Sequence, residues 1–131
     1  MNRQIKQVAQ FNKSFKVKMP KGISIPDNDT LEMRQRILQE EIDELNAAQK
    51  SKNIVEVADA IIDCMYILIG TAEAFGLSQL LEPMFDEVHR SNMSKLDAKG
   101  KPIYREDGKV LKGVNYTRPQ LDRIIYEHMK Y

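Results

Sequence analysis

The first half of the chain carries apolar residues at helical spacing. Between residues 2 and 16 they recur every three or four positions, which predicts an amphipathic helix. The next stretch, KMPKGISIPDNDT, holds two prolines, a glycine and several turn-forming residues and therefore predicts a loop. Thr30 is a suitable cap for a second helix, which ends before the polar connector QKSKN. The predicted buried stripe of this helix consists of Leu31, Leu38, Ile42 and Leu45.

A third helix is predicted from Ile54 to about Phe75, and it is apolar on almost every side. Gly76 is well placed to terminate it. A helix of this kind has to be covered on every side. Because a chain of 131 residues with three or four helices can barely provide that cover, the pattern predicts a symmetric homodimer, or a dimer of dimers, with a shared helical core.

The second half of the chain changes character after a fourth predicted helix. Ser78 can cap this helix, which runs to about Met93, and Pro83 lies either in its first turn or at a kink. The segment KPIYREDGKVLKG has two short alternating runs around an Asp-Gly pair, which predicts a β-hairpin. Residues 121–129 return to helical spacing. The sequence therefore predicts one all-α domain, residues 1–131, as a bundle of four to five helices with a small C-terminal β-hairpin.

The composition narrows the possible surroundings of the protein. A hydrophobic content of 42% and a charged content of 30% are typical of a soluble globular chain. No apolar run approaches the ~20 residues needed to cross a bilayer, and the polar N-terminal stretch lacks the apolar centre of a signal peptide. Cys64 is the one cysteine, so no internal disulfide can form. We therefore expect a cytoplasmic protein with no membrane partner.

The charges are distributed unevenly along the chain. Residues 31–88 contain twelve acidic and four basic residues, whereas residues 1–30 contain six basic and two acidic ones. Residues 89–131 are basic again, with ten basic and five acidic residues. This order suits a site where carboxylates meet cations and basic side chains meet a polyanion. The ordinary charge of helical surfaces explains it equally well.

The carboxylates of the acidic middle repeat at helical spacing on two neighbouring helices. Glu41 and Glu44 lie three residues apart, as do Glu56 and Asp59, and Asp63 extends the second stripe by one turn. The short connector favours antiparallel helices, so the two pairs can face each other. Unpaired carboxylates in such an interface are costly and require protons, basic side chains or cations. Oxygen ligands suit Mg²⁺ best, with Mn²⁺ as a possible substitute.

Several alternatives to this metal site can be weighed against the sequence. For the residues of the EEIDE segment alone, a solvated acidic face is the better interpretation, but the apolar third helix leaves little room for one. Basic side chains are scarce in both acidic stretches. A di-iron site needs Glu-x-x-His on two helices, and only Asp86-x-x-His89 comes near. A zinc site is less suitable still, with one cysteine and no paired histidines.

These motifs resemble a known superfamily. EEIDE followed by EVAD is similar to the Glu-Glu-x-x-Glu plus Glu-x-x-Asp signature of the all-α nucleoside triphosphate pyrophosphohydrolases. The continuations DAIIDCMYILIGTAEAFG and DEVHRSNMSK resemble its MazG-like, phosphoribosyl-ATP pyrophosphohydrolase-like branch, over about residues 30–116. One departure is that only eleven residues separate Glu44 from Glu56, which is short for the family. The resemblance implies Mg²⁺-dependent cleavage of a nucleoside triphosphate to a monophosphate and pyrophosphate.

The resemblance also implies roles for individual residues. The residues matching its metal ligands are Glu41, Glu44, Glu56 and Asp59. Glu40 matches the neighbouring residue that binds a further ion or activates water. Asn92 and Lys95 match polar positions that meet the nucleotide. The predicted nucleotide-binding set is Asp63, Asn92, Lys95, Arg90, Lys112 and Tyr116. Lysines are ordinary surface residues as well, and Lys109 is the weakest of the basic candidates.

Three functions stay open at this point. The leading one is a nucleoside triphosphate pyrophosphohydrolase that removes non-standard or surplus nucleotides, with no nucleic-acid polymer as partner. The second is phosphoribosyl-ATP hydrolysis in histidine biosynthesis. The third is a non-catalytic helical module whose acidic stripe contacts a basic partner. Phe11 and Phe15 could stack on a base, but at their helical spacing we expect them to pack in the core.

Overall fold

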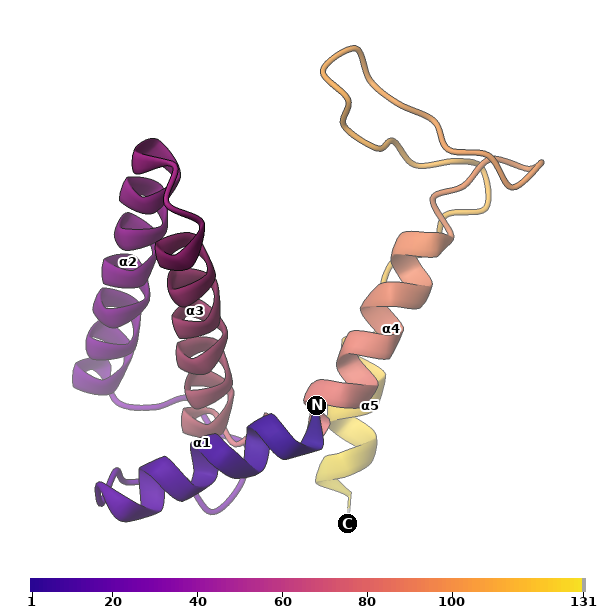
Figure 1. Ribbon diagram of the computed structural model, residues 1–131. Helices are drawn as coiled ribbons and strands as arrows, with labels where there is room; N and C mark the ends of the chain where they lie inside the picture. Colours follow the sequence, from indigo (N-terminus) through magenta and orange to yellow (C-terminus); the bar gives the residue numbers. More distant parts are fainter. Residues whose placement is uncertain (131) are drawn as a thin grey trace. The chain divides into compact units, whose positions relative to one another are not determined.

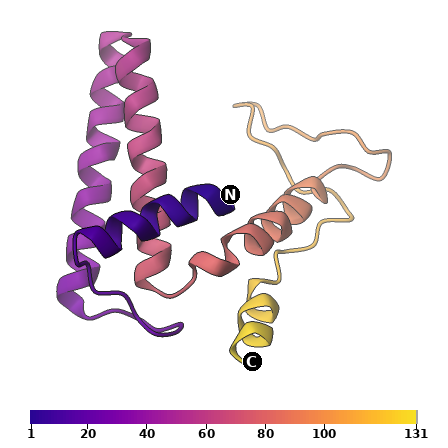
Figure 2. The ribbon, with the colours of Figure 1, turned by 60° about the horizontal axis from the view of Figure 1, so that its bottom comes forward.

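The computed structural model describes residues 1–130, which contain five α-helices and one short 3₁₀ helix (Figures 1 and 2). The elements are α1 (Asn2–Ser14), α2 (Asn28–Ser51), α3 (Ile54–Ala74), η1 (Ser78–Leu80), α4 (Leu81–Met93) and α5 (Leu121–Met129). The all-α prediction is confirmed, because no β-sheet occurs among these residues. The chain forms two compact units, one of residues 1–79 and one from Leu80 onward.

The second helix begins earlier than the sequence predicted. Asp27, not Thr30, caps α2, and its carboxylate accepts a hydrogen bond of 2.8 Å from the backbone N–H of Thr30. That bond lowers the pKa of Asp27 and satisfies one of the N–H groups that a helix leaves without an internal partner. Of the predicted buried stripe, Ile42 is exposed, whereas Leu38 and Leu45 are half-buried.

A two-residue turn joins α2 to α3 and sets their antiparallel arrangement. Lys52 adopts a left-handed conformation with φ of 54° and ends α2. Asn53 then caps α3 by accepting hydrogen bonds from the backbone N–H groups of Val55 and Glu56. The two helices run side by side in the first unit (Figure 1). The expected antiparallel neighbours, separated by a short turn, are confirmed.

Buried polar contacts fasten the three helices of the first unit together. α1 lies across α3 in both ribbon views (Figures 1 and 2). The buried Asn12 of α1 donates a hydrogen bond to the buried carboxylate of Glu73 on α3. Arg34 of α2 donates to the hydroxyl of Thr71 at 3.1 Å. A Cβ at Gly70 would lie 2.6 Å from the Arg34 guanidinium, so glycine permits this close approach.

Much of the apolar surface of α3 is not enclosed within the described chain. Ile54 is 76% exposed and Ile62 is 59% exposed, while Ala60, Ile69 and Ala74 are buried. The intrachain cover therefore reaches only part of the helix circumference. The predicted oligomer, which would cover the rest, stays a prediction.

In the second unit, hydrogen bonds join α4 to the segment that precedes α5. Glu87 accepts two hydrogen bonds from Arg90 and one from the backbone N–H of Gln120. These bonds lower the pKa of Glu87 to about 2. Ser91 is buried and donates to the carbonyl of Thr117 at 2.8 Å. Pro83 lies in the first turn of α4, where its missing N–H costs nothing.

The predicted C-terminal β-hairpin is wrong. The segment makes a turn at Asp107-Gly108, but its pairing is reduced to one isolated antiparallel bridge between Tyr104 and Val110. Flanking hydrogen bonds, such as that from the Arg105 N–H to the Lys109 carbonyl at 2.8 Å, do not extend it into strands. A lone two-stranded pairing has only marginal stability when neither a third strand nor a helix buries one of its faces.

None of the helices within residues 1–130 combines the length and apolarity needed to cross a bilayer.

Candidate metal centre

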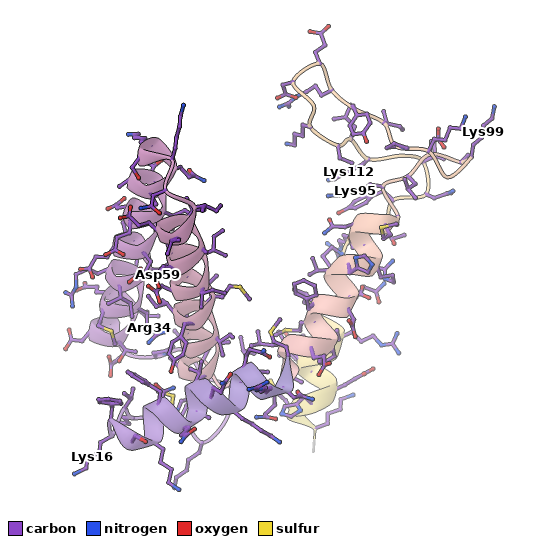
Figure 3. All side chains as sticks on the ribbon, viewed as in Figure 1. Lys16, Arg34, Asp59, Lys95, Lys99 and Lys112 are labelled. Atoms are coloured by element: carbon purple, nitrogen blue, oxygen red, sulfur yellow. The ribbon has the colours of Figure 1, made fainter. Side chains whose placement is uncertain are left out.

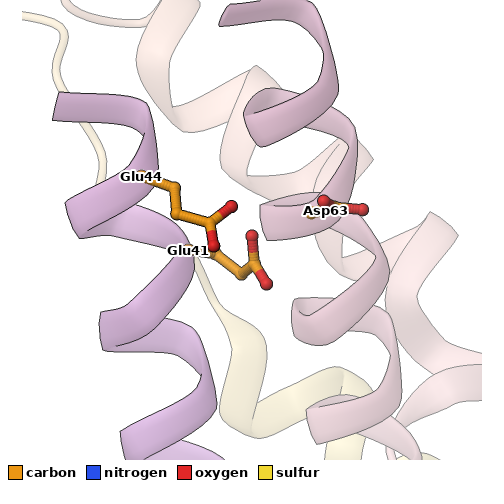
Figure 4. A group of neighbouring side chains, drawn as sticks. All are labelled: Glu41, Glu44 and Asp63. Atoms are coloured by element: carbon orange, nitrogen blue, oxygen red, sulfur yellow. The ribbon is translucent and has the colours of Figure 1, made fainter. Parts of the chain in front are cut away.

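Three carboxylates from the two antiparallel helices of the first unit gather at one place. Glu41 and Glu44 extend from α2 towards α3, and Asp63 belongs to α3 (Figure 4). Each offers one oxygen atom, and the three atoms lie within 4.8 Å of one another. The i, i+3 spacing of the two glutamates places both on the side of α2 that faces α3. This group is hereafter called the carboxylate triad.

The surroundings of Glu41 disfavour the charged form of its carboxylate. Its Oε2 atom is buried and has no hydrogen-bond partner among the described residues. Burial raises the pKa of Glu41, and the neighbouring charges of Glu44, Asp63 and Asp59 raise it further. No ion pair within residues 1–130 reaches any member of the triad. A cation bound among these carboxylates would relieve the repulsion at Glu41.

Two further carboxylates line a hollow beside the triad. Glu56 and Asp59 surround it together with Glu44, which belongs to both groups, and its volume is about 440 Å³. Figure 3 shows Asp59 on the side of α3 that faces α2. The remaining lining residues are small, namely Ala47, Ala48, Ser51 and Ala60. Small side chains leave room between the helices beside the three carboxylates.

The exposure of Glu56 and Asp59 differs from the sequence-based expectation. Both side chains are exposed, although they stand in the apolar third helix. The expected enclosure of α3 included cover from a second subunit and stays a prediction, whereas within one chain α2 and α1 cover only part of the helix. In the single chain the carboxylates of the hollow are therefore accessible to solvent and ions.

Asp63 was predicted to bind nucleotide, and in the structure it is the α3 carboxylate that groups with Glu41 and Glu44. Its spacing of four residues from Asp59 is the signal that places it on the same stripe. Glu40 is exposed and lines a separate surface depression with neighbouring polar residues of α2. These neighbours are Glu32, Gln35, Arg36, Gln39 and Asp43. The structure does not bring Glu40 together with the triad.

The predicted nucleotide-binding residues of the second unit form two contacting pairs. Lys95 donates a hydrogen bond to the side-chain oxygen of Asn92 at 2.9 Å. The Lys112 ammonium lies over the ring of Tyr116, 4.6 Å from its centroid. The backbone N–H of Gly113 donates to the Lys95 carbonyl at 2.8 Å and draws the two pairs close together (Figure 3).

Arg90, another predicted nucleotide-binding residue, is already engaged in contacts within the second unit. Its guanidinium binds the Glu87 carboxylate at 2.7 Å. The same group donates to the hydroxyl of Thr117 at 2.6 Å and to the Arg118 carbonyl at 3.2 Å. These contacts give Arg90 a role in holding the segment before α5 against α4.

The donor atoms of the triad suit a hard divalent cation. All of them are carboxylate oxygens, which Mg²⁺ and Mn²⁺ prefer over softer ligands. The buried Glu41 oxygen without a partner is the atom that a cation would satisfy. The residues present therefore fit the metal dependence that the motifs implied.

Comparison with known proteins agrees with this geometry. The family model of phosphoribosyl-ATP pyrophosphohydrolase matches residues 8–92, which include both helices of the triad. No curated protein matches the chain. The match spans more than half of the sequence and supports the resemblance drawn from the acidic motifs. The chain belongs to the phosphoribosyl-ATP pyrophosphohydrolase family, a MazG-like, all-α family of hydrolases that act on phosphoanhydride bonds.

Proposed function

We propose that this protein is a Mg²⁺-dependent pyrophosphohydrolase that cleaves nucleoside triphosphates to monophosphates and pyrophosphate and so removes surplus or damaged nucleotides. The observation that carries the proposal is the Glu41 carboxylate, whose buried oxygen lacks a partner beside Glu44 and Asp63. A structural ion pair does not account for it, since no basic side chain of the described chain pairs with the triad.

The role that we propose for each side chain follows from its position. Glu41, Glu44 and Asp63 would hold the cation, and Glu56 and Asp59 line the adjoining hollow. When bound, such a cation neutralises phosphate charge and lowers the pKa of a coordinated water. Asp59 is exposed on the wall of the hollow, and we propose that it accepts a proton from the attacking water. Activation of water by Glu40 stays a prediction.

Binding of phosphate oxygens by the basic residues Lys95 and Lys112 of the second unit stays a prediction from the sequence. Lys95 uses one of its three N–H donors on Asn92, which leaves donors for a phosphate. Lys112, held over the Tyr116 ring, is a second cation of the same segment. Asn92 and Tyr116 would then fix the two ammonium groups in place.

A second candidate substrate is phosphoribosyl-ATP, and the family match favours it. The same triad serves either reaction, because both cleave a phosphoanhydride next to a nucleoside. The two reactions differ in what the protein must recognise beyond the phosphates. Phosphoribosyl-ATP carries an additional ribose phosphate on its base.

The test is pyrophosphate release from a substrate panel in the presence of Mg²⁺. The panel contains the common and deoxy nucleoside triphosphates together with phosphoribosyl-ATP. Faster turnover of one or more nucleoside triphosphates than of phosphoribosyl-ATP supports the proposal. Preference for phosphoribosyl-ATP assigns the second function. Release from none of them indicates a non-catalytic helical module and overturns both.

A further inference from the structure

Three aromatic side chains of the first unit form a cluster between α1 and α3. The rings of Phe11 and Phe15 are stacked, with centroids 4.4 Å apart and an interplanar angle of 29°. Tyr66 of α3 meets Phe11 edge to face, with centroids 5.7 Å apart. These three residues are hereafter called the aromatic cluster.

The aromatic cluster is not part of the packed core, so the sequence-based expectation for Phe11 and Phe15 was wrong. Phe11 is 42% exposed, Phe15 is 68% exposed and Tyr66 is 38% exposed. The residues of α1 that do enter the core are Ile5, Val8 and Asn12. Phe15 is the C-cap residue of α1 and directly follows the last residue of the helix.

The position of the cluster links it to the carboxylate triad. Tyr66 lies three residues after Asp63 on α3, so the two side chains are neighbours on the helix surface, about 4.5 Å apart along its axis. The buried hydrogen bond from Asn12 to Glu73 fixes α1 across α3 and sets Phe11 beside Tyr66. The exposed rings and the triad thus belong to the same compact unit, residues 1–79.

We infer that the aromatic cluster is the base-binding surface of the nucleotide site, with the nucleobase stacked on the exposed ring of Phe15. The inference rests on the proposed function, because it takes the triad as the place of the phosphates. An aromatic ring with a free face stacks on any base, and one such contact contributes strongly to binding. Stacking of this kind tolerates different bases and favours the larger purines. The cluster therefore predicts a broad base preference in which purine nucleotides lead.

The experiment compares two substitutions at Phe15 on substrates with and without a base. Phe15→Leu keeps an apolar side chain but removes the ring face, whereas Phe15→Tyr retains it, and solvent can accommodate the added hydroxyl. The substrates are ATP and ribose 5′-triphosphate, hydrolysed with Mg²⁺. Phe15→Leu should lower kcat/KM for ATP about five- to twentyfold and leave that for ribose 5′-triphosphate unchanged. Phe15→Tyr should retain the wild-type values for both.

The control is Phe85→Leu, since Phe85 is an exposed ring of the second unit. This variant should leave kcat/KM unchanged for both substrates. Equal losses on both substrates with Phe15→Leu, or a loss on neither, would overturn the inference. If Phe15→Leu lowers the sedimentation coefficient and leaves the ratio of kcat/KM for ATP to that for ribose 5′-triphosphate unchanged, the rings contact a second copy of the chain. That result would also overturn the inference.

A binding measurement keeps this test separate from that of the proposed function. 2-Aminopurine riboside 5′-triphosphate loses fluorescence when its base stacks on a ring. Wild type and Phe15→Tyr should quench it on binding, and Phe15→Leu should quench it less. Quenching without pyrophosphate release would contradict the proposed function and support the base-binding surface. Turnover of ATP without any quenching would support the proposed function and contradict the base-binding surface.

Discussion

At the residue scale, the carboxylate triad was only partly predictable. The i, i+3 and i, i+4 spacings put Glu41, Glu44, Asp59 and Asp63 on facing stripes. The structure brings Glu41, Glu44 and Asp63 together and places Asp59 on the wall of the adjoining hollow. Which of the α3 carboxylates comes nearest to Glu41 depends on the rotation and register of the two helices. The turn at Lys52-Asn53 and the close packing of Arg34 on Gly70 set that register, and neither is evident from periodicity.

The raised pKa of Glu41 leads to a pH-dependent stability in the absence of metal. Because folding favours the protonated carboxyl, stability should fall as the pH rises from about 4.5 through the raised pKa. Glu41→Gln keeps the shape and removes the charge, so it should remove that fall and raise Tm by about 1–4 °C at pH 7–8. Thermal melts in a chelating buffer between pH 4 and 8 measure this difference. A variant less stable than wild type by the same amount at every pH would contradict it.

At the element scale, most helices could be predicted because their caps and breakers are local. Asn53 and Gly76 lie where the boundaries of α3 were expected, and α5 occupies the expected residues. Thr30 was mistaken for a cap because Asp27, Asp29 and Thr30 are all suitable cap residues, and the backbone entry angle decides between them. The hairpin failed because alternation alone does not supply a surface on which to bury one of its faces.

Gly76 offers a test of how α3 ends. Its φ is +73°, and an added Cβ would lie 2.4 Å from the backbone oxygen of Gly22. Gly76→Ala should therefore cost at least about 1–2 kcal/mol and lower Tm by several degrees. Gly22→Ala is the matched control, since a Cβ there meets nothing within 4 Å. Equal Tm values for the two variants would show that this helix end does not need glycine.

At the scale of the whole molecule, the exposed apolar face of α3 is the feature that one chain leaves unexplained. Its exposed residues include Ile54, Val55, Ile61, Ile62, Met65 and Leu68. A contiguous apolar face of this kind is typical of an interface between subunits. The homodimer or dimer of dimers and the single-domain organisation were predicted from the sequence, and they stay predictions. Periodicity identified the apolar helix but could not show which part of its surface the chain itself covers.

We propose that α3 forms the core of a dimer, and sedimentation at micromolar concentration tests it. Wild type should sediment as a dimer or larger assembly. Ile62→Glu places a charge on the exposed face of α3 and should yield monomers. Ile25→Glu, at a residue 77% exposed in the loop before α2, is the control and should leave the assembly intact. A wild-type monomer would contradict the proposal.

The most direct measurement is pyrophosphate release, titrated with Mg²⁺, by wild type, Glu41→Gln and Asp43→Asn. Asp43 is an exposed carboxylate of α2 that lies outside the triad, so its variant matches the loss of charge without touching the site. Wild type and Asp43→Asn should be inactive without metal and reach the same maximum with Mg²⁺. Glu41→Gln should lose at least about a hundredfold in kcat/KM and require more Mg²⁺, because the removed charge contacts the cation. Release that is independent of metal, or equal in all three proteins, would contradict a metal centre at the carboxylate triad.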